Sequence, residues 1–427
     1  MSVQPLSPGR RLIGAYAELP VISGPSFLPI SFLGRLPTTM TPLAILTFTA
    51  ASTGSFAAAG LAATAIAAGT SVGGPLMGRT ADRHGQRPVL LVSALVNALA
   101  LTALAFRPDA GRAELLGLCA LIGLSMPQVG GMARARWLAL SRRHAGTAMA
   151  YEGTADELAY VLGPALAGLL ASAGGPAAAL LAAAVAGILA VGAFALHPTH
   201  AATEHRHGPE IGRTTRLLDD ASTLVQESDP DPPVIARDRI GAALVVPALA
   251  MVLMGAFFAA AQTAITVFVT ALDRPSSGGL IYALMAIGSA GTALATAAIP
   301  VRYGPRSRCA VPAAGLVIGV LLMASAGTVP VLCAAVLFTG LWVGPIMVTL
   351  NQVAGALAPV GRTATTMAYL GAGSVVGVAL GATGSGALAD AGGSLGGFAV
   401  AAAASAALLL LALLGLRPSP QRPVPGI

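Results

Sequence analysis

The chain alternates long apolar runs with short polar breaks, and this pattern predicts its secondary structure. A helix that crosses a membrane needs about 20 largely apolar residues. The runs that meet this requirement lie at 27–50, 56–77, 88–106, 114–133, 147–171, 176–196, 241–271, 278–299, 309–327, 330–355, 363–388 and 395–416. The pattern therefore predicts an all-α integral membrane protein with twelve transmembrane helices.

One long polar stretch, residues 197–240, interrupts the apolar runs near the middle of the chain. It contains the sequence Asp-Pro-Asp-Pro-Pro at 229–233, and such composition cannot bury a hydrophobic core. We therefore expect a cytoplasmic linker between two six-helix bundles. The predicted parts are an N-terminal segment at 1–26, a bundle at 27–196, the linker at 197–240, a second bundle at 241–416 and a tail at 417–427.

The two predicted bundles are related in sequence. Met-Ala-Tyr at 149–151 recurs at 367–369, and Arg-x-Gly-x-Arg at 83–87 recurs at 302–306. Each pair occupies the equivalent helix or loop of its half. Because each half has an even number of helices, the repeat predicts two pseudo-symmetric bundles in parallel orientation.

Composition supports the membrane prediction. The chain is 55% hydrophobic and 10% charged, whereas soluble domains carry about 25% charged residues. The net charge of +7 comes from Arg residues that punctuate the apolar runs. Most of them fall on one side if both termini are cytoplasmic, as the positive-inside rule requires of a plasma-membrane protein. Dispersed Arg residues do not indicate a nucleic-acid partner.

The loop after the second predicted helix carries a recognisable motif. Residues 78–87 read Gly-Arg-Thr-Ala-Asp-Arg-His-Gly-Gln-Arg. This resembles the signature G-x-x-x-D-R-x-G-R/K-R/K of the major facilitator superfamily, with Gln86 in place of a basic residue. The resemblance implies a twelve-helix fold, and a conformational gate formed by Gly78, Asp82, Arg83, Gly85 and Arg87.

In that gate, Asp82 would cap the positive N-terminus of the eleventh helix near Thr363 and latch the two halves together. The alternative is that these charges only set the membrane topology.

The fifth predicted helix carries a second motif. Gly163-Pro164 and Gly168, with Gly153 ten residues earlier, resemble the G-P-x-x-G-G signature of the superfamily's exporters, with Ala167 in place of the first closing Gly. The resemblance implies close packing of this helix across the two halves and a bend at Pro164. A simple proline kink is the alternative.

The arginine-bearing signature of the superfamily's fourth helix is not evident. Gln128 lies within the fourth predicted span, and Arg134 and Arg136 lie just past its cytoplasmic end. This departure weakens the match to a simple multidrug–proton antiporter.

Charged residues inside a membrane are costly, and those that persist often carry function. Arg35 lies in the first predicted span, and Glu152, Asp156 and Glu157 lie in the fifth. Glu152 and Asp156 share a helix face because they are four residues apart, and Arg35 lies at a depth where it can pair with one carboxylate. These residues are candidates for proton coupling, since a buried carboxylate can take up and release a proton. The alternative is a static ion pair that fixes helix packing.

Further polar and aromatic residues lie in spans that line the central cavity in this superfamily. The substrate-cavity candidates are Gln128, Gln262, Tyr282, Trp342, Asn351 and Gln352. Interhelical hydrogen bonds or plain packing are the alternatives for each. The aromatic content of 4% and the scarcity of charge favour a neutral or weakly polar substrate.

Together, the sequence predicts a secondary active transporter that exports a small organic solute by proton antiport with alternating access. Its partners would be the solute, protons and membrane lipid. The chain lacks a phosphate-binding GKS/T loop, a nucleophile elbow and metal-ligand spacing, so ATP, enzymatic activity, cofactors and metals are not expected. Proton-coupled uptake and a non-transporting membrane sensor or scaffold remain as alternatives.

Overall fold

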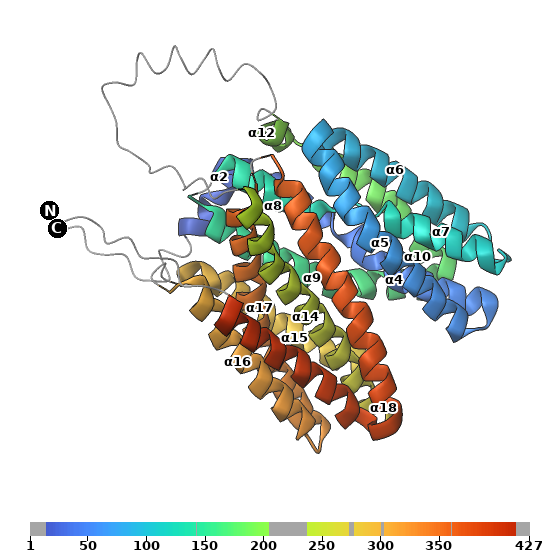
Figure 1. Ribbon diagram of the computed structural model, residues 1–427. Helices are drawn as coiled ribbons and strands as arrows, with labels where there is room; N and C mark the ends of the chain where they lie inside the picture. Colours follow the sequence, from blue (N-terminus) through green and yellow to red (C-terminus); the bar gives the residue numbers. More distant parts are fainter. Residues whose placement is uncertain are drawn as a thin grey trace, which may run out of the picture.

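The computed structural model describes residues 14–141, 143–204, 237–272, 277–299, 303–359 and 361–415. These residues form helices joined by short turns (Figure 1). Within them, 11 helical segments are long and apolar enough to cross a membrane. The first predicted span is not among these 11, because it is divided into two shorter helices. It supplies the twelfth membrane segment.

The N-terminal half begins with the short helix α2 (Leu19–Ser23). Its membrane helices are α3 (Phe27–Leu33) with α4 (Leu36–Thr53), α5 (Phe56–His84), α6 (Gln86–Ala105), α7 (Arg112–Leu124) with α8 (Val129–Leu140), α9 (Ala145–Gly174), and α10 (Pro176–Ala186) with η1 (Gly187–Val191) and α11 (Gly192–Leu196). The predicted linker begins with two short helical segments, η2 (Pro198–His200) and α12 (Ala201–Glu204).

The C-terminal half consists of α14 (Arg237–Thr270), α15 (Gly278–Ala295) with η5 (Thr296–Ala298), α16 (Pro305–Ala324), α17 (Val329–Leu357) and α18 (Thr363–Gly415). The two last predicted spans meet within α18, where Gly392 and Gly393 leave helical geometry. The predicted tail at 417–427 and most of the predicted linker lie outside the described residues.

Prolines divide the first and fourth spans. Pro37 follows the break between α3 and α4, and Pro127 lies in the break between α7 and α8. Proline has no N–H to donate and disfavours helical geometry in the residue before it. The two breaks touch, because the Thr38 hydroxyl donates to the Pro127 carbonyl at 3.3 Å. A non-helical backbone is tolerated at membrane depth only where protein covers it.

The fourth span extends further than predicted. The expected end was residue 133, but α8 continues to Leu140. Arg134 and Arg136, which the sequence placed past the end of the span, are buried within this helix. Their positive charges are typical of loop residues, but in the fold these charges are compensated by hydrogen-bond and ion-pair partners.

The most extensive contacts between the two halves are made by two helix pairs. Helix α9 of the N-terminal half packs against α15 of the C-terminal half, and α5 packs against the first part of α18 (Figure 1). The sequence repeat maps the fifth helix onto the eleventh and the second onto the eighth, so these two contacts are equivalent. The interface is therefore two-fold symmetric in its helix pairing, as expected of parallel repeats.

Contacts between the halves concentrate at one end of the bundle, at the upper left in Figure 1, which carries the α5–α6 turn and α12. We call it the Asp82 end and the opposite one the far end. A Cβ on Gly78 would lie 2.8 Å from the Ala364 carbonyl oxygen, so α5 and α18 touch through their backbones. Gln352 Nε2 donates to the Gly146 carbonyl at 3.3 Å in the same region. Within the described residues, the halves are joined at the Asp82 end.

Candidate functional site

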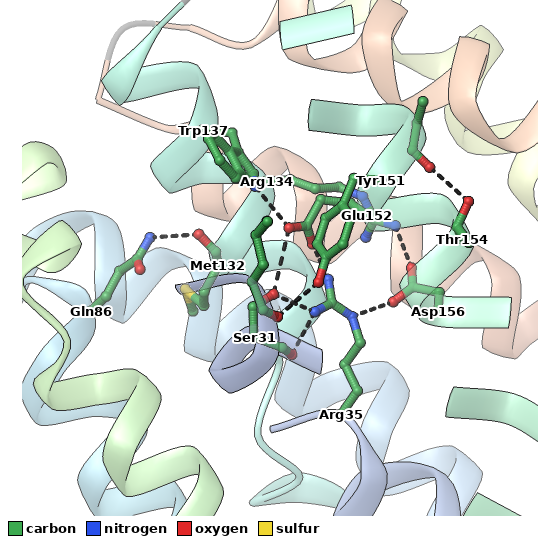
Figure 2. Close-up of polar contacts among 12 residues, drawn as sticks. Ser31, Arg35, Gln86, Met132, Arg134, Trp137, Tyr151, Glu152, Thr154 and Asp156 are labelled. Carbon is green, nitrogen blue, oxygen red and sulfur yellow. Dashed lines mark hydrogen bonds and ion pairs between the residues drawn. The ribbon is translucent and has the colours of Figure 1, made fainter. Parts of the chain in front are cut away.

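Arg35 lies at the break between α3 and α4, which aims its side chain into the N-terminal half. Its side chain is 5% exposed. NH1 donates to the Ser31 carbonyl at 2.6 Å and to the Ser31 hydroxyl at 2.7 Å. Nε donates to Asp156 Oδ1 at 2.6 Å, and NH2 forms an ion pair with Glu152. Arg35 thus bridges two carboxylates of α9 (Figure 2).

Two residues of α8 complete this cluster. Arg134 NH2 forms an ion pair with the second oxygen of Asp156, and Trp137 Nε1 donates to Glu152 Oε1 at 2.8 Å. Figure 2 shows the contacts of the Asp156 carboxylate with both Arg134 and Arg35. The charges alternate in the order Glu152, Arg35, Asp156, Arg134. This four-residue ion-pair network is electrically neutral and joins three membrane segments.

The sequence predicted this site in part. Pairing of Arg35 with a carboxylate of the fifth helix is confirmed, but Arg35 contacts two carboxylates rather than one. Sequence reasoning missed Arg134 because it placed this residue outside the membrane. Charge balance was the signal that could have found it: one Arg among three buried carboxylates leaves charge uncompensated.

Gly130 makes room for the network. A Cβ at this position would lie 3.2 Å from Asp156 Oδ1, 3.4 Å from Arg134 NH1 and 3.5 Å from Arg35 Nε. Of these distances, only the one to Asp156 is tighter than ordinary van der Waals contact. Gly130 therefore lies directly against the charged groups, and a Cβ there would require the Asp156 carboxylate to shift by a few tenths of an ångström.

Asp82 makes the contact that the sequence predicted between the halves. Asp82 Oδ1 accepts the Ala364 N–H at 3.1 Å, and Oδ2 accepts the Thr365 N–H at 2.7 Å. These are amides of the first turn of α18, so the carboxylate caps the positive end of the eleventh helix, as expected. The predicted contact is confirmed.

Other residues of this loop have separate positions, including Arg79, which the predicted gate did not contain. Arg79 donates to the Tyr369 hydroxyl and lies 5.4 Å from the centre of its ring. Gly85 has a φ of 85°, which glycine adopts without strain. Arg83 and Arg87 are exposed. Gating by this loop is therefore a proposal carried by Asp82, Gly78 and Arg79.

The structure corrects the interpretation of the helix-five motif. A Cβ on Gly163 would overlap the Thr39 side chain of α4, so Gly163 packs helices within one half and not across the two halves. Gly168 has nothing within 4 Å of an added Cβ. Gly153 does face the other half, where a Cβ would lie 3.2 Å from Val348 Cγ2. Pro164 lies inside the continuous helix α9.

The cavity candidates are dispersed. Gln352 lines a cavity of about 350 Å³ at the Asp82 end, together with Asp82, Gln86 and Thr203. The buried Asn351 donates to the Met347 carbonyl of its own helix at 2.8 Å. Because this bond is intrahelical, it favours the packing alternative for Asn351.

The remaining candidates divide between packing and exposed positions. Trp342 packs against Phe338, with ring centres 5.8 Å apart, and Gly315 makes room for its ring. Gln128 Nε2 donates to the Met126 carbonyl at 3.2 Å in the α7–α8 break. Gln262 is exposed. Tyr282 lies near Glu157, across the interface between the halves.

The comparisons agree with this arrangement. The model of the Major Facilitator Superfamily matches residues 27–328. The chain belongs to the major facilitator superfamily. Membership makes it a multi-pass membrane transporter with the twelve-helix fold. No curated protein matches the chain.

Solved transporters share this superfamily fold. The human organic anion transporter MFSD10 (TETRAN) superimposes with a TM-score of 0.66 at 21% identity, covering 92% of this chain and 99% of that one. The superfamily's proton:xylose symporter XylE, bound to 6-bromo-6-deoxy-D-glucose, gives a TM-score of 0.61 at 14% identity, covering 90% and 94%. A double-Trp XylE mutant gives 0.68 at 12% identity, covering 93% and 96%. At these identities the likeness concerns the fold.

Proposed function

We propose that this chain is a secondary active transporter of the plasma membrane that exports a small organic solute by proton antiport. Both termini would lie in the cytoplasm, which makes the Asp82 end the cytoplasmic end. The observation that carries the proposal is the buried network of Glu152, Arg35, Asp156 and Arg134, because it joins three membrane segments through charges that a proton can cancel.

The network explains how a proton would act on the helices. Protonation of Asp156 would remove the charge that holds Arg35 and Arg134 together, and two buried guanidinium groups would then share one ionised partner, Glu152. The helices that carry them would have to move or rehydrate. Asp156 is the more accessible carboxylate, with 26% of its side chain exposed against 0% for Glu152. We therefore assign proton uptake to Asp156.

The latch supplies the second part of alternating access. The α18 cap by Asp82 and the close α5–α18 packing join the halves at the Asp82 end. Release of substrate on the opposite side requires the halves to stay joined here, and loading from this side requires the latch to open. Such rigid-body rocking of two repeats is the usual form of alternating access.

Reconstitution tests the proposal. Proteoliposomes would carry a pH-sensitive dye inside, and a panel of organic solutes would be added outside. Wild type would be compared with Glu152→Gln, Asp156→Asn and Glu157→Gln. We expect a solute to drive proton movement in the wild type and Asp156→Asn to abolish it. Solute flux that continues in all four proteins without proton movement would refute proton coupling.

Direction needs its own measurement, because the structure gives Gly163 a role within one half and thus removes one argument for export. Proton-coupled uptake is the second candidate. With a pH gradient imposed in each direction, antiport predicts that solute and protons move oppositely. Movement in the same direction would favour uptake by symport. Binding without any flux would favour a sensor or scaffold.

A further inference from the structure

Glu157 stands apart from the ion-pair network. It follows Asp156 directly, so it points to a different side of α9 and faces α15 of the other half. Among the described residues, neither Arg nor His lies within the 4.0 Å of an ion pair. Glu152 and Asp156, by contrast, are both neutralised. A carboxylate without a cation inside a membrane protein is energetically costly, and ionisable residues that persist at such positions are usually functional.

The register between α9 and α15 fixes what Glu157 faces. Thr154 Oγ1 donates to the Ala290 carbonyl at 3.2 Å, which anchors the two helices one turn before Glu157. The Ser289 side chain is fully buried, and its hydroxyl approaches the Glu157 carboxylate. This hydroxyl has no hydrogen-bond partner at standard distance among the described residues. The Ser289 hydroxyl thus has hydrogen-bonding capacity that none of the described residues uses.

Two tyrosines lie beside this pair on the side of the far end. Tyr160 follows Glu157 by three residues and shares its helix face. Tyr282 precedes Ser289 by seven residues, or about two turns of α15. Tyr282 lies close enough to interact electrostatically with both Glu157 and Tyr160. The two tyrosines are therefore neighbours across the halves.

The accessibility of α9 changes along its length. Gly153, nearer the Asp82 end, is in tight contact with the other half, whereas Tyr160 is 69% exposed. A solute entering between the halves from the far end would meet the rings first and the carboxylate beyond them.

We propose that Glu157, Ser289, Tyr160 and Tyr282 bind a protonated organic amine. This proposal rests on the transport function proposed above and names its substrate class. The carboxylate supplies the opposite charge, and the Ser289 hydroxyl accepts an N–H of the ammonium group. The tyrosine rings attract a cation through their π-faces, as in aromatic sites for ammonium ligands. The neutral or weakly polar substrate expected from the sequence is thereby replaced by a cationic one.

The charge balance of the N-terminal half supports a cation over an anion. Arg35 and Arg134 are both occupied by carboxylates, so they offer no unpaired charge to an anionic solute. Glu157, when ionised, offers a negative charge that no Arg or His among the described residues pairs with. An amine bound there neutralises the last uncompensated carboxylate of α9.

Equilibrium binding to the full chain in detergent tests this site without any gradient. The probes would be three naphthalene compounds of similar size: 1-naphthylmethylamine, 1-naphthalenemethanol and 1-naphthoate. We expect the amine to bind at least about tenfold more tightly than the other two, which corresponds to the loss of one good polar interaction. Glu157→Gln should weaken amine binding by about tenfold or more.

Matched variants make the outcome decisive. Glu114→Gln removes an exposed carboxylate, paired with Arg107 at 3.1 Å, and should leave amine binding unchanged. Tyr282→Phe keeps the ring and should retain amine binding, whereas Tyr282→Leu should weaken it. If Glu157→Gln does not fold, these two Tyr282 variants test the site in its place. Equal binding of the amine and naphthoate, or unchanged binding in both Glu157→Gln and Tyr282→Leu, would overturn the site.

Failure of this site and failure of the transport proposal give different results. If the site is correct and proton coupling is wrong, the amine binds but its flux moves no protons. If coupling is correct and the site is wrong, protons move with another solute while the amine does not bind.

Discussion

Gln86 accepts a hydrogen bond from Arg136, with 2.8 Å between Oε1 of the amide and Nε of the guanidinium. Both side chains are buried, with exposed fractions of 2% and 0%. The Gln86 amide also donates to the Met132 carbonyl at 3.3 Å. Arg136 further donates to the Phe194 carbonyl at 2.8 Å. This pair accounts for the departure from the superfamily's loop signature, since a basic residue at position 86 would face a buried guanidinium.

Restoring the basic residue should therefore be harmful. We expect Gln86→Arg to lower the free energy of unfolding by about 3 kcal/mol, because it removes an acceptor and buries a second positive charge. Thermal unfolding in detergent would measure this, with Arg87→Gln at the exposed neighbouring position as the control. If the Gln86→Arg protein is as stable as the control, the contact with Arg136 does not prevent a basic residue at position 86.

The two glycines of the helix-five motif should respond differently to the same change. Gly163→Ala places a methyl group against Thr39, and overpacking of this kind costs about 1–3 kcal/mol. Gly168→Ala adds its methyl group to open space and should be neutral or slightly stabilising, since alanine favours helices. The unfolding temperatures of the two variants check this prediction. Equal unfolding temperatures would contradict it.

The ion-pair network should show strong coupling between its members. Arg134→Gln leaves Asp156 with one cation, and removal of one partner from a buried pair costs about 3–5 kcal/mol. Adding Asp156→Asn should recover part of this loss, so the double variant should be more stable than the sum of the single effects indicates. Arg107→Gln, in an exposed pair, should cost at most about 1 kcal/mol. Additive effects would argue against the network.

The latch can be followed at the amides that it caps. Hydrogen bonds to a charged group contribute about 1.5–3 kcal/mol each, so Asp82→Ala should accelerate hydrogen exchange at Ala364 and Thr365 by about tenfold or more. Hydrogen–deuterium exchange with peptide-level resolution would measure this. Peptides from α6, which lies outside the α5–α18 interface, serve as the internal control. Unchanged exchange at the start of α18 would contradict a stabilising cap.

Acid should loosen the segment that follows α11. Burial lowers the pKa of His197, and the neighbouring Arg136 and His200 lower it further. On acidification, His197 of the unfolded chain therefore takes up a proton near pH 6.5, at a higher pH than in the folded state. By linkage, stability is constant above this pH and falls as the pH drops below it, until His197 is protonated in the folded state as well.

Unfolding temperatures between pH 7.5 and 5 would check this dependence. His197→Gln should reduce the loss of stability on acidification, whereas His84→Gln, at an exposed position, should retain it. A His197→Gln protein with the same pH dependence as the wild type would place the effect elsewhere.

The fold could be predicted from the sequence because hydrophobic runs of membrane length are a strong and local signal. The Asp82 cap followed from a motif with a known geometry. Arg134 and the role of Gly163 could not be predicted, because both depend on contacts between distant segments. The breaks at Pro37 and Pro127 were also missed, since the apolar runs continue through them and only packing between the breaks makes them stable.

The neutral network has a consequence for the response to membrane voltage. Moving one elementary charge through the full potential changes the energy by about 2.3 kcal/mol per 100 mV. Arg35 and Arg134 balance Glu152 and Asp156, so this cluster moves no net charge when its half rocks. Glu157 would then be the charge of the fifth helix that senses the field, and a cation bound beside it would cancel that sensitivity. While Asp156 is ionised, the amine-loaded transporter therefore turns over independently of voltage. When the empty transporter returns with a proton on Asp156, the net positive charge of the network balances Glu157, so this step is also insensitive to voltage.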